Sequence, residues 1–268
     1  LPFFKNEELK VTFLDVGLGD STLIQLPDGR NMLIDGGGLF GDFDIGESVV
    51  APYLWDRGIE KIDFIVPTHS DNDHMEGLFY VLKEMKSGVV WTNSLIPFKT
   101  SLTHLENFAI KKRIPIKDQK NILKNFNIEI KKIHPTKEFV SNYFERKENN
   151  FSTVIQLNYG AISFLFASDI ENEAEEYLVK KNAGKLRATI LKVPHHGSKT
   201  SSTVRFINAV KPQVAVISAG RLNRFRHPAK EVIQRYEKNN VKIYRTDLDG
   251  AVTITTDGLE YEIKTFVR

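Results

Sequence analysis

Two histidines and two aspartates lie close together in the segment Thr68-His69-Ser70-Asp71-Asn72-Asp73-His74. The segment directly follows the apolar run Phe64-Ile65-Val66, which predicts a strand. A strand that ends in such a cluster places imidazole nitrogens and carboxylate oxygens at the edge of a sheet, where they can surround a cation. A polar turn with incidental histidines is the alternative, but four potential ligands in so short a stretch favour a metal site.

The spacing of these four ligands suits two cations about 3.5–4 Å apart. His69 and Asp71 would bind one ion. Asp73 and His74 would bind the other. The oxygen-rich donor set favours Mn²⁺ without excluding Zn²⁺. In such a centre the nucleophile is a hydroxide that bridges the cations, because the cations lower the pKa of water to near neutrality.

An internal repeat predicts where further ligands come from. The sequence STLIQL at residues 21–26 reappears as STVIQL at residues 152–157. Each copy continues through an apolar strand to an aspartate, which is Asp35 in the first copy and Asp169 in the second. Asp169 is therefore expected at the end of its own strand, where it is the natural carboxylate to bridge two cations.

A second match follows in the same order, because the sequence VPTH at residues 66–69 is matched by VPHH at residues 193–196. Two matches predict two similarly built α/β halves that pack sheet against sheet, with helices on the outer faces. The loops at the strand ends would then meet along one edge. His195 or His196 would complete the second cation site.

Apolar periodicity and turn residues predict the remaining elements. Strands are expected at 10–16, 21–26, 31–35, 62–66, 214–218 and 242–245, helices at 47–57, after His74, at 171–181 and at 229–238, and a hairpin at 251–267. Residues 99–150 are rich in lysine and weakly patterned. His104 and His134 lie in that stretch without a partner nearby in sequence, which favours structural or surface roles.

The bulk composition suits a single domain over residues 1–268 with a sizeable core. The hydrophobic content of 41% and charged content of 26% are ordinary for a globular protein, and no apolar run is long enough to span a membrane. The absence of cysteine excludes disulfides, zinc–thiolate sites and thiol nucleophiles. A net charge of +3 permits an anionic substrate. Because the chain does not begin with methionine, we expect it to be part of a longer protein.

The chain resembles the metallo-β-lactamase superfamily, whose signature is His-x-His-x-Asp-His followed by further His, Asp and His ligands. More narrowly, it resembles the C-terminal domain of the ComEC/Rec2 competence proteins, the DNA-uptake channels of naturally transformable bacteria, in which an Asp takes the place of the second His. The resemblance rests on residues 13–20, 33–37, 68–74, 193–198 and 244–247. Leu18 departs from the Gln that is usual in the first of these segments.

This resemblance implies a four-layer αββα sandwich and a metal-dependent nuclease that degrades the non-transported DNA strand during natural transformation. It also implies an extracytoplasmic domain of a bacterial inner-membrane protein. The implied partners are single-stranded DNA and the membrane channel region of the same polypeptide, without lipid binding by the domain itself. The implied ligands of the two divalent metal ions, Mn²⁺ or Zn²⁺, are His69, Asp71, Asp73, His74, Asp169 and His195.

Three residues are candidates for a direct part in catalysis, namely Asp73, His196 and His227. The superfamily pattern places a ligand directly at a strand end, which favours His195 as the ligand and leaves His196 to support it or to donate a proton. His227 is a candidate to protonate the leaving oxygen or to bind phosphate. A surface histidine that caps a helix is the alternative for His227.

The superfamily's middle histidine ligand has no counterpart in this chain, and Asn149 or Asn150 occupies roughly its place. The candidate substrate contacts are Asn150, Ser198, Lys199 and Arg221, with solvated surface as the alternative. Besides a DNA phosphodiesterase, two other functions stay open: a stand-alone hydrolase of a small phosphodiester, lactone or thioester, and a non-catalytic domain that guides DNA into the uptake channel. Superfamily membership says little about substrate, so β-lactamase activity is not expected.

Overall fold

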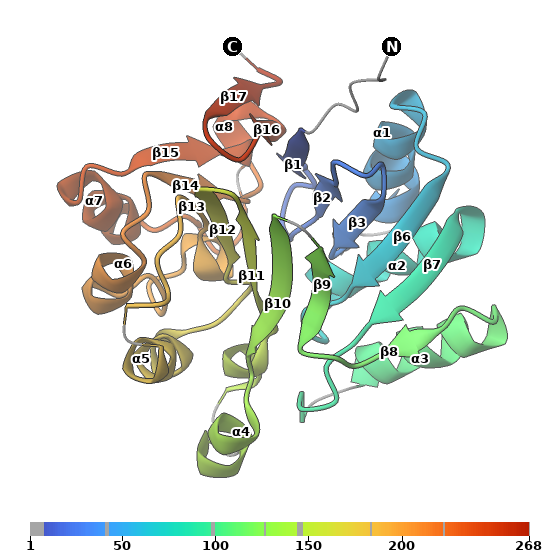
Figure 1. Ribbon diagram of the computed structural model, residues 1–268, viewed down its shortest axis with the longest axis horizontal. Helices are drawn as coiled ribbons and strands as arrows, with labels where there is room; N and C mark the ends of the chain where they lie inside the picture. The colour runs from blue at the N-terminus through green and yellow to red at the C-terminus, as the bar shows by residue number, and fades with distance from the viewer. Residues whose placement is uncertain are drawn as a thin grey trace.

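Two β-sheets pack face to face in the computed structural model, and helices cover the outer side of each sheet (Figure 1). The four-layer αββα sandwich implied by the resemblance is therefore confirmed. Each half of the repeat contributes one sheet, and the C-terminal hairpin joins the sheet of the first half. The structure describes residues 8–40, 43–97, 100–125, 127–143, 147–182, 184–221 and 223–267.

The first sheet has eight strands in the order β17-β16-β1-β2-β3-β6-β7-β8. The strands are β1 (Leu9–Phe13), β2 (Thr22–Gln25), β3 (Asn31–Ile34), β6 (Lys61–Val66), β7 (Lys86–Trp91), β8 (Ile116–Lys117), β16 (Val252–Thr256) and β17 (Tyr261–Thr265). Strands β1, β2 and β3 pair antiparallel, whereas β3, β6, β7 and β8 pair parallel. Between β3 and the first helical segment, β4 (Leu39–Phe40) and β5 (Phe43–Asp44) form a small sheet of their own.

The second sheet has seven strands in the order β15-β14-β13-β12-β11-β10-β9. The strands are β9 (Asn121–Asn125), β10 (Ile128–His134), β11 (Val154–Tyr159), β12 (Ile162–Phe166), β13 (Ile190–Lys192), β14 (Val214–Ile217) and β15 (Lys242–Arg245). Strands β9 to β12 pair antiparallel and strands β12 to β15 pair parallel.

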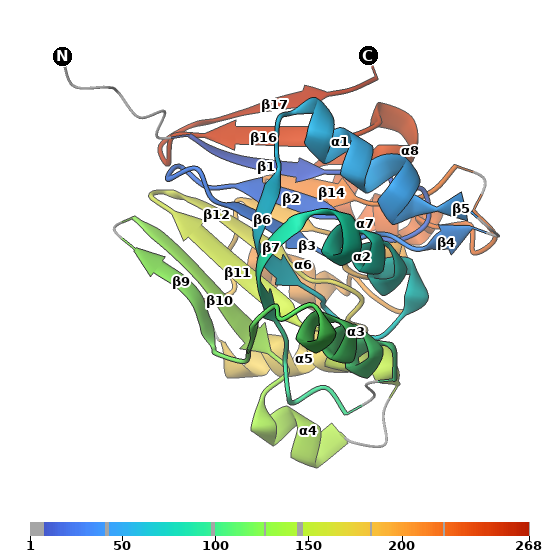
Figure 2. The same ribbon diagram turned by 90° about the vertical axis from the view of Figure 1, so that its right-hand side faces the viewer.

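Helices lie on the outer face of each sheet, and Figure 2 shows α1, α2 and α3 over the first one. The helical segments of the first half are the π-helical turn η1 (Gly46–Val50), α1 (Ala51–Asp56), α2 (Asn72–Glu84) and α3 (Thr100–Lys111). Those that follow are α4 (Lys137–Tyr143), α5 (Asn172–Lys181), α6 (Val204–Val210), α7 (Lys230–Lys238) and α8 (Thr246–Asp249), with the 3₁₀ turns η2 (Glu148–Phe151) and η3 (Pro194–Gly197).

The internal repeat seen in the sequence is a repeat of strand topology. The succession β1-β2-β3-β6-β7 in the first sheet corresponds to β10-β11-β12-β13-β14 in the second, because each consists of two antiparallel pairings followed by two parallel ones. Asp35 and His69 follow β3 and β6, and Asp169 and His196 follow β12 and β13. The carboxyl ends of these strands meet at one edge, which is the convergence predicted from the repeat.

Three buried apolar clusters hold the four layers together, one between the sheets and one beneath each set of helices. The alternation of side chains along a strand divides the residues between these layers. Ile24 and Met32 belong to the cluster between the sheets, whereas Leu23 and Leu33 belong to the cluster beneath α1–α3. Burial of each such side chain contributes about 1.5–3 kcal/mol. Both sheets are thus fixed on two faces, which gives the strand-end loops a rigid base.

Local differences from the sequence predictions lie mainly at element ends. The helix expected at 47–57 begins with the π-helical turn η1, and Gly58, with φ 68°, ends it as predicted. The helix expected after His74 begins at Asn72, inside the ligand motif. The stretch 99–150 contains α3, α4 and three strands. Among the described residues, no helix is both long and apolar enough to cross a membrane.

Candidate metal centre

The ligand motif runs from the end of β6 into the first turn of α2. His69 follows the strand, Asp71 has extended backbone as the residue before the helix, and Asp73 and His74 lie in its first turn. Free N–H groups and the helix dipole at this end favour nearby carboxylates. The motif residues are consequently placed by two rigid elements instead of by a free loop.

Asp35 orients the histidine of this helix turn. The carboxylate accepts hydrogen bonds from the backbone N–H of Thr68 at 2.8 Å and from its hydroxyl at 2.7 Å. His74 Nδ1 lies 2.8 Å from Asp35 Oδ2, and because a carboxylate only accepts, Nδ1 carries the proton. The lone pair of His74 is therefore on Nε2, the nitrogen that faces Asp169.

His69 and His196 are held in the same way. His69 Nδ1 lies 3.0 Å from the hydroxyl oxygen of Thr68, and His196 Nδ1 lies 3.1 Å from the carbonyl oxygen of Ser218. Each Nδ1–H group can donate to its oxygen, which leaves Nε2 free to bind a cation. Histidines that bind metals are commonly oriented by such a partner on the other ring nitrogen.

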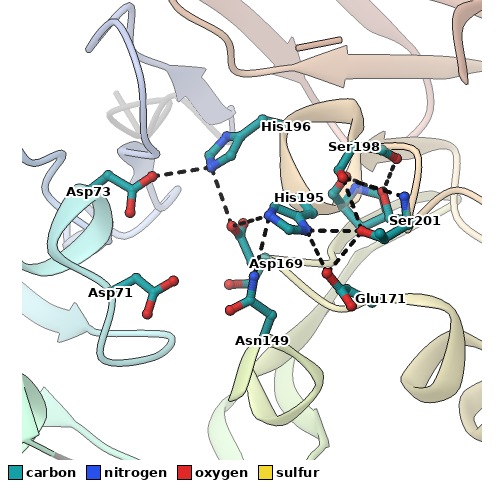
Figure 3. A network of polar contacts seen from close by, with 12 residues as sticks. Asp71, Asp73, Asn149, Asp169, Glu171, His195, His196, Ser198 and Ser201 are labelled. Carbon is teal, nitrogen blue, oxygen red and sulfur yellow. Dashed lines mark hydrogen bonds and ion pairs between the residues drawn. The ribbon is translucent and has the colours of Figure 1, made fainter. Parts of the chain in front are cut away.

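Asp169 stands between the two halves of the cluster, and Figure 3 shows His196 between Asp169 and Asp73. Asp169 Oδ1 lies 3.4 Å from His74 Nε2, and its Oδ2 lies 3.3 Å from His196 Nε2. His196 Nε2 is also 3.6 Å from Asp73 Oδ2. The two oxygens of Asp169 thus face different histidines, as a bridging carboxylate requires.

A divalent cation fits this cluster because its donor atoms face one another without hydrogen bonds. His69 Nε2, His74 Nε2, His196 Nε2 and Asp169 Oδ1 are buried and make no hydrogen bond within the described part of the chain. Leaving a buried polar atom without a hydrogen bond costs about 1–3 kcal/mol, and a bound cation would satisfy all four. The metal-compatible groups in this region are His69-His74-Asp169, Asp73-His74-His196, Asp20-Asp169-His196 and Asp20-Asp35-His74, each with donor atoms within 4.8 Å of one another.

The electrostatics of the cluster favour positive charge. Burial lowers the pKa of His74, but the carboxylates of Asp169 and Asp35 outweigh it and raise that pKa well above its usual range. Burial also opposes charge on His196, whose pKa Asp169 and Asp20 nevertheless raise to about 10. A metal ion would take the place of these protons, so its affinity must rise with pH.

Asp20 and Lys192 form a buried ion pair beside the cluster, with side chains 6% and 3% exposed. Asp20 precedes β2 in the first half and Lys192 ends β13 in the second, so the pair joins the two sheets at the site. The carbonyl oxygen of Asp20 also accepts from the backbone N–H of Gly37 at 2.8 Å, which fixes the loop before β2. Lys192 was missed, because a lysine at a strand end resembles ordinary surface.

Glycines allow the loops around the motif to approach α2 closely. A Cβ on Gly19 would lie 2.0 Å from the carbonyl oxygen of Asp73, and a Cβ on Gly38 would lie 2.7 Å from the Cα of Asp73. A Cβ on Gly36 would lie 2.6 Å from the backbone nitrogen of Leu78. Gly19, Gly36 and Gly38 therefore allow the loops to pack closely against α2.

His196 lies deeper in the cluster than His195. Both residues have left-handed backbone, with φ 48° and 51°, and η3 turns His196 into the cluster. His195 is 20% exposed, and its Nδ1 lies 3.4 Å from Glu171 Oε1. Its Nε2 is 3.9 Å from Asp169 Oδ2, and no metal-compatible group among the described residues includes it. This geometry favours His196 as a ligand, in line with the internal repeat that aligned His196 with His69, and the choice of His195 stays a prediction.

Three predicted substrate contacts lie elsewhere. Asn150 is buried, and its side chain oxygen accepts from the backbone N–H groups of Glu171 and Ala174 at the start of α5. Ser198 is buried and bonds to the hydroxyl of a neighbouring threonine. Lys199 is exposed and pairs with a glutamate of α7. None of these three residues lines the cavity described below.

A cavity of about 1100 Å³ opens beside the cluster. The residues that line it include Asp71, Asp73, Asp169 and both histidines of η3, together with Arg221 and His227 from the loop after β14. His69 Nε2 lies 3.6 Å from Asp71 Oδ2 at the cavity edge. Burial and the neighbouring His195 and His196 lower the pKa of His227 to about 4, so its imidazole is neutral near pH 7. A neutral ring can bind phosphate through its N–H group and is a weaker acid than an imidazolium.

His104 and His134 have the non-catalytic places expected of them. His134 is fully buried, and its Nε2 lies 2.7 Å from the carbonyl oxygen of Asn150. His104 is exposed on α3. Asn149, which was expected near the missing histidine ligand, has its amide nitrogen 3.3 Å from His195 Nε2.

Comparison with known proteins places these features in a family. The model of the metallo-beta-lactamase superfamily matches residues 14–221. ComE operon protein 3 of Bacillus subtilis is 28% identical over 92% of this chain and 33% of its own length. Competence protein ComA of Neisseria gonorrhoeae is 30% identical over 91% of this chain and 32% of its own length. The resemblance to competence proteins is confirmed, and the chain spans about a third of the length of these relatives.

Solved structures agree on the fold. Igni18, a metallo hydrolase from the archaeon Ignicoccus hospitalis, superposes with a TM-score of 0.58 at 14% identity and covers 93% of this chain and 98% of its own. The strand-end cluster of histidines and aspartates occupies the edge where this αββα architecture gathers its loops. The chain belongs to the metallo-β-lactamase superfamily.

Proposed function

We propose that this domain is a metal-dependent phosphodiesterase that cuts single-stranded DNA, and that it degrades the non-transported strand during natural transformation. The observation that carries the proposal is the set of buried donors of His69, His74, His196 and Asp169 that face one another without a hydrogen bond within the described residues. Bound divalent ions, Mn²⁺ or Zn²⁺, supply Lewis acidity and lower the pKa of water to near neutrality. The donors of both halves open into one cavity, which gives a phosphodiester access to the centre.

The charge pattern of the cavity supports a phosphodiester substrate. Asp71, Asp73 and Asp169 concentrate negative charge where the cations would bind, and Arg221 and Arg224 line the same cavity. Arg221 is fixed there, since its Nε donates to the carbonyl oxygen of Asp247 at 2.9 Å. Its guanidinium can hold a phosphate oxygen while the neighbouring His227 donates an N–H group.

The competence relatives support DNA as the substrate and DNA uptake as the setting. We further infer that the domain is extracytoplasmic, that it is part of a larger inner-membrane protein, and that it works beside the membrane channel region of that polypeptide. DNA that meets this domain would be the strand left outside the channel.

Cleavage of labelled single-stranded DNA by metal-loaded protein tests the proposal. With Mn²⁺ or Zn²⁺ the wild type should cut the strand, and Asp73→Asn should lower kcat/KM by more than about 100-fold, because it removes a carboxylate from one cation site. Asp56→Asn on α1 is the matched control, since Asp56 is exposed and pairs only with its neighbour Arg57 among the ion pairs of the described residues.

Two results would contradict the proposal. One is an absence of DNA cleavage with either ion, and the other is equal cleavage by Asp73→Asn and wild type. Hydrolysis of a small phosphodiester, lactone or thioester without DNA cleavage would support a stand-alone hydrolase. DNA binding by a protein that takes up no metal would support a non-catalytic guide.

A further inference from the structure

Aromatic side chains of the loop that follows β14 line the same cavity as the metal cluster. Phe225 lines the cavity, yet the residue is 52% exposed. Its ring stacks on that of His227, with centroids 5.7 Å apart and an interplanar angle of 19°. The Arg224 guanidinium carbon lies 4.7 Å from the centre of the Phe225 ring. We refer to Arg224, Phe225 and His227 together as the Phe225 platform.

The platform is connected to the metal cluster through rings. The centroids of His227 and His195 are 5.9 Å apart, and His195 Nε2 lies 3.9 Å from the Asp169 carboxylate. Only the rings of His195 and His227 therefore separate the metal cluster from Phe225. This separation suits a polymeric ligand, in which one unit reacts at the cluster while the next unit reaches Phe225.

The loop that carries the platform is held in shape by Asn223. The side chain amide of Asn223 donates to the carbonyl oxygens of Gly220 at 2.8 Å and His227 at 2.6 Å. Its oxygen accepts from the backbone N–H of His227 at 2.9 Å. Three hydrogen bonds from one side chain keep the loop closed, so the exposed ring is presented without an ordering cost on binding.

Other apolar residues line the same cavity. Phe43, which begins β5 in the first half, is 52% exposed. Leu18 and Ile45 line the cavity as well. An exposed phenylalanine from each half thus borders the cavity that also holds the charged cluster, a combination that suits a flat apolar group attached to an anion.

We propose that the Phe225 platform is a nucleobase-binding subsite, on which a base that flanks the scissile phosphate stacks. This inference rests on the proposed function. Single-stranded nucleic acid offers both the phosphate and an uncovered base face, and stacking on aromatic side chains together with Arg contacts is how proteins hold such strands. In a duplex the base faces are covered by their neighbours, so the platform selects unpaired strands.

Binding of two fluorescent oligomers of equal length tests the subsite in the metal-loaded protein. One is an oligothymidylate, and the other has the same backbone with abasic residues throughout. Phe225→Ala should weaken oligothymidylate binding by about 5- to 150-fold, the cost of one lost base stack, and should change binding of the abasic oligomer by less than about two-fold. Phe225→Trp should bind oligothymidylate as tightly as wild type or tighter.

Phe266→Ala is the matched control, because Phe266 is 81% exposed on the C-terminal hairpin and does not line the cavity. It should bind both oligomers as wild type does. Equal affinity of wild type and Phe225→Ala for oligothymidylate would overturn the subsite, as would an equal loss for both oligomers.

Cleavage of the same oligomers by wild type separates this inference from the proposed function. If the wild type binds oligothymidylate through Phe225 but cuts neither oligomer, the subsite stands and the nuclease assignment fails. If it cuts both oligomers and Phe225→Ala cuts oligothymidylate as wild type does, the nuclease assignment stands and the subsite fails.

Discussion

Replacing Asp35 by Asn should weaken metal binding without unfolding the protein. Asp35 does not face the cavity, and it acts through three hydrogen bonds of 2.7–2.8 Å from Thr68 and His74. Its backbone is left-handed, with φ 57°, a conformation that asparagine adopts readily. The substitution therefore removes the charge and one acceptor oxygen while keeping the size and the backbone preference.

The effect on His74 follows from hydrogen-bond chemistry. The amide nitrogen of an asparagine turned toward His74 would donate to Nδ1, which moves the ring proton to Nε2, the nitrogen that must bind the cation. Loss of such an orienting partner typically lowers metal affinity 10- to 100-fold. This corresponds to about 1.4–2.7 kcal/mol of binding free energy.

Isothermal titration of Mn²⁺ into chelator-treated protein near pH 7.5 measures this change. Asp35→Asn should bind Mn²⁺ about 10- to 100-fold more weakly than wild type. Asp15→Asn is the control, because Asp15 lines the same cavity without a hydrogen bond to a histidine within the described residues, and its affinity should stay within about three-fold. If Asp35→Asn folds and binds Mn²⁺ as tightly as wild type, the orienting role assigned to Asp35 is wrong.

Further predictions concern stability and the choice of ligand. Lys192→Met should lower the free energy of unfolding by about 3–5 kcal/mol in urea melts, because it removes the lysine that pairs with the buried Asp20 carboxylate, whereas Lys199→Met should change it by less than about 1 kcal/mol. Burial raises the pKa of Glu175 from 4.5 to about 7, so the native state favours the protonated carboxyl group. The stability that this preference contributes is lost as pH rises from 4.5 to 7. The free energy of unfolding of the wild type, measured in urea melts, should therefore fall by up to about 3 kcal/mol relative to that of Glu175→Gln between pH 4.5 and pH 7, and an equal pH dependence of the two proteins would contradict this. His196→Ala should abolish tight Mn²⁺ binding in the titration and His195→Ala should largely retain it, and the reverse order would restore His195 as the ligand.

Much of the fold was predictable because its signals are local. Apolar runs bounded by glycine or aspartate predicted most of the strands. Two short motifs that recur in the same order predicted two similar halves whose strand ends converge. His69, Asp73, His74 and Asp169 follow from that convergence, since each lies directly after a strand or in the helix turn beyond it.

Other features depend on information that the residue types do not carry. The histidine of this pair that points into the cluster is determined by the left-handed backbone of His195 and His196, and the residue types do not predict such a backbone. Strand β10 escaped prediction because it contains adjacent lysines, one of which, Lys132, is buried against Asp118. The burial of Lys192 was not predicted either, because its partner Asp20 is distant in sequence.

Anomalous X-ray scattering at the manganese edge, from crystals of this protein equilibrated with Mn²⁺, tests the metal centre most directly. The expected result is electron density for manganese within binding distance of Asp73, His74 and His196, with Asp169 between this position and a second one beside His69. Crystals that contain ordered manganese only outside the cavity, or none at all, would contradict the assignment of these residues as a metal centre.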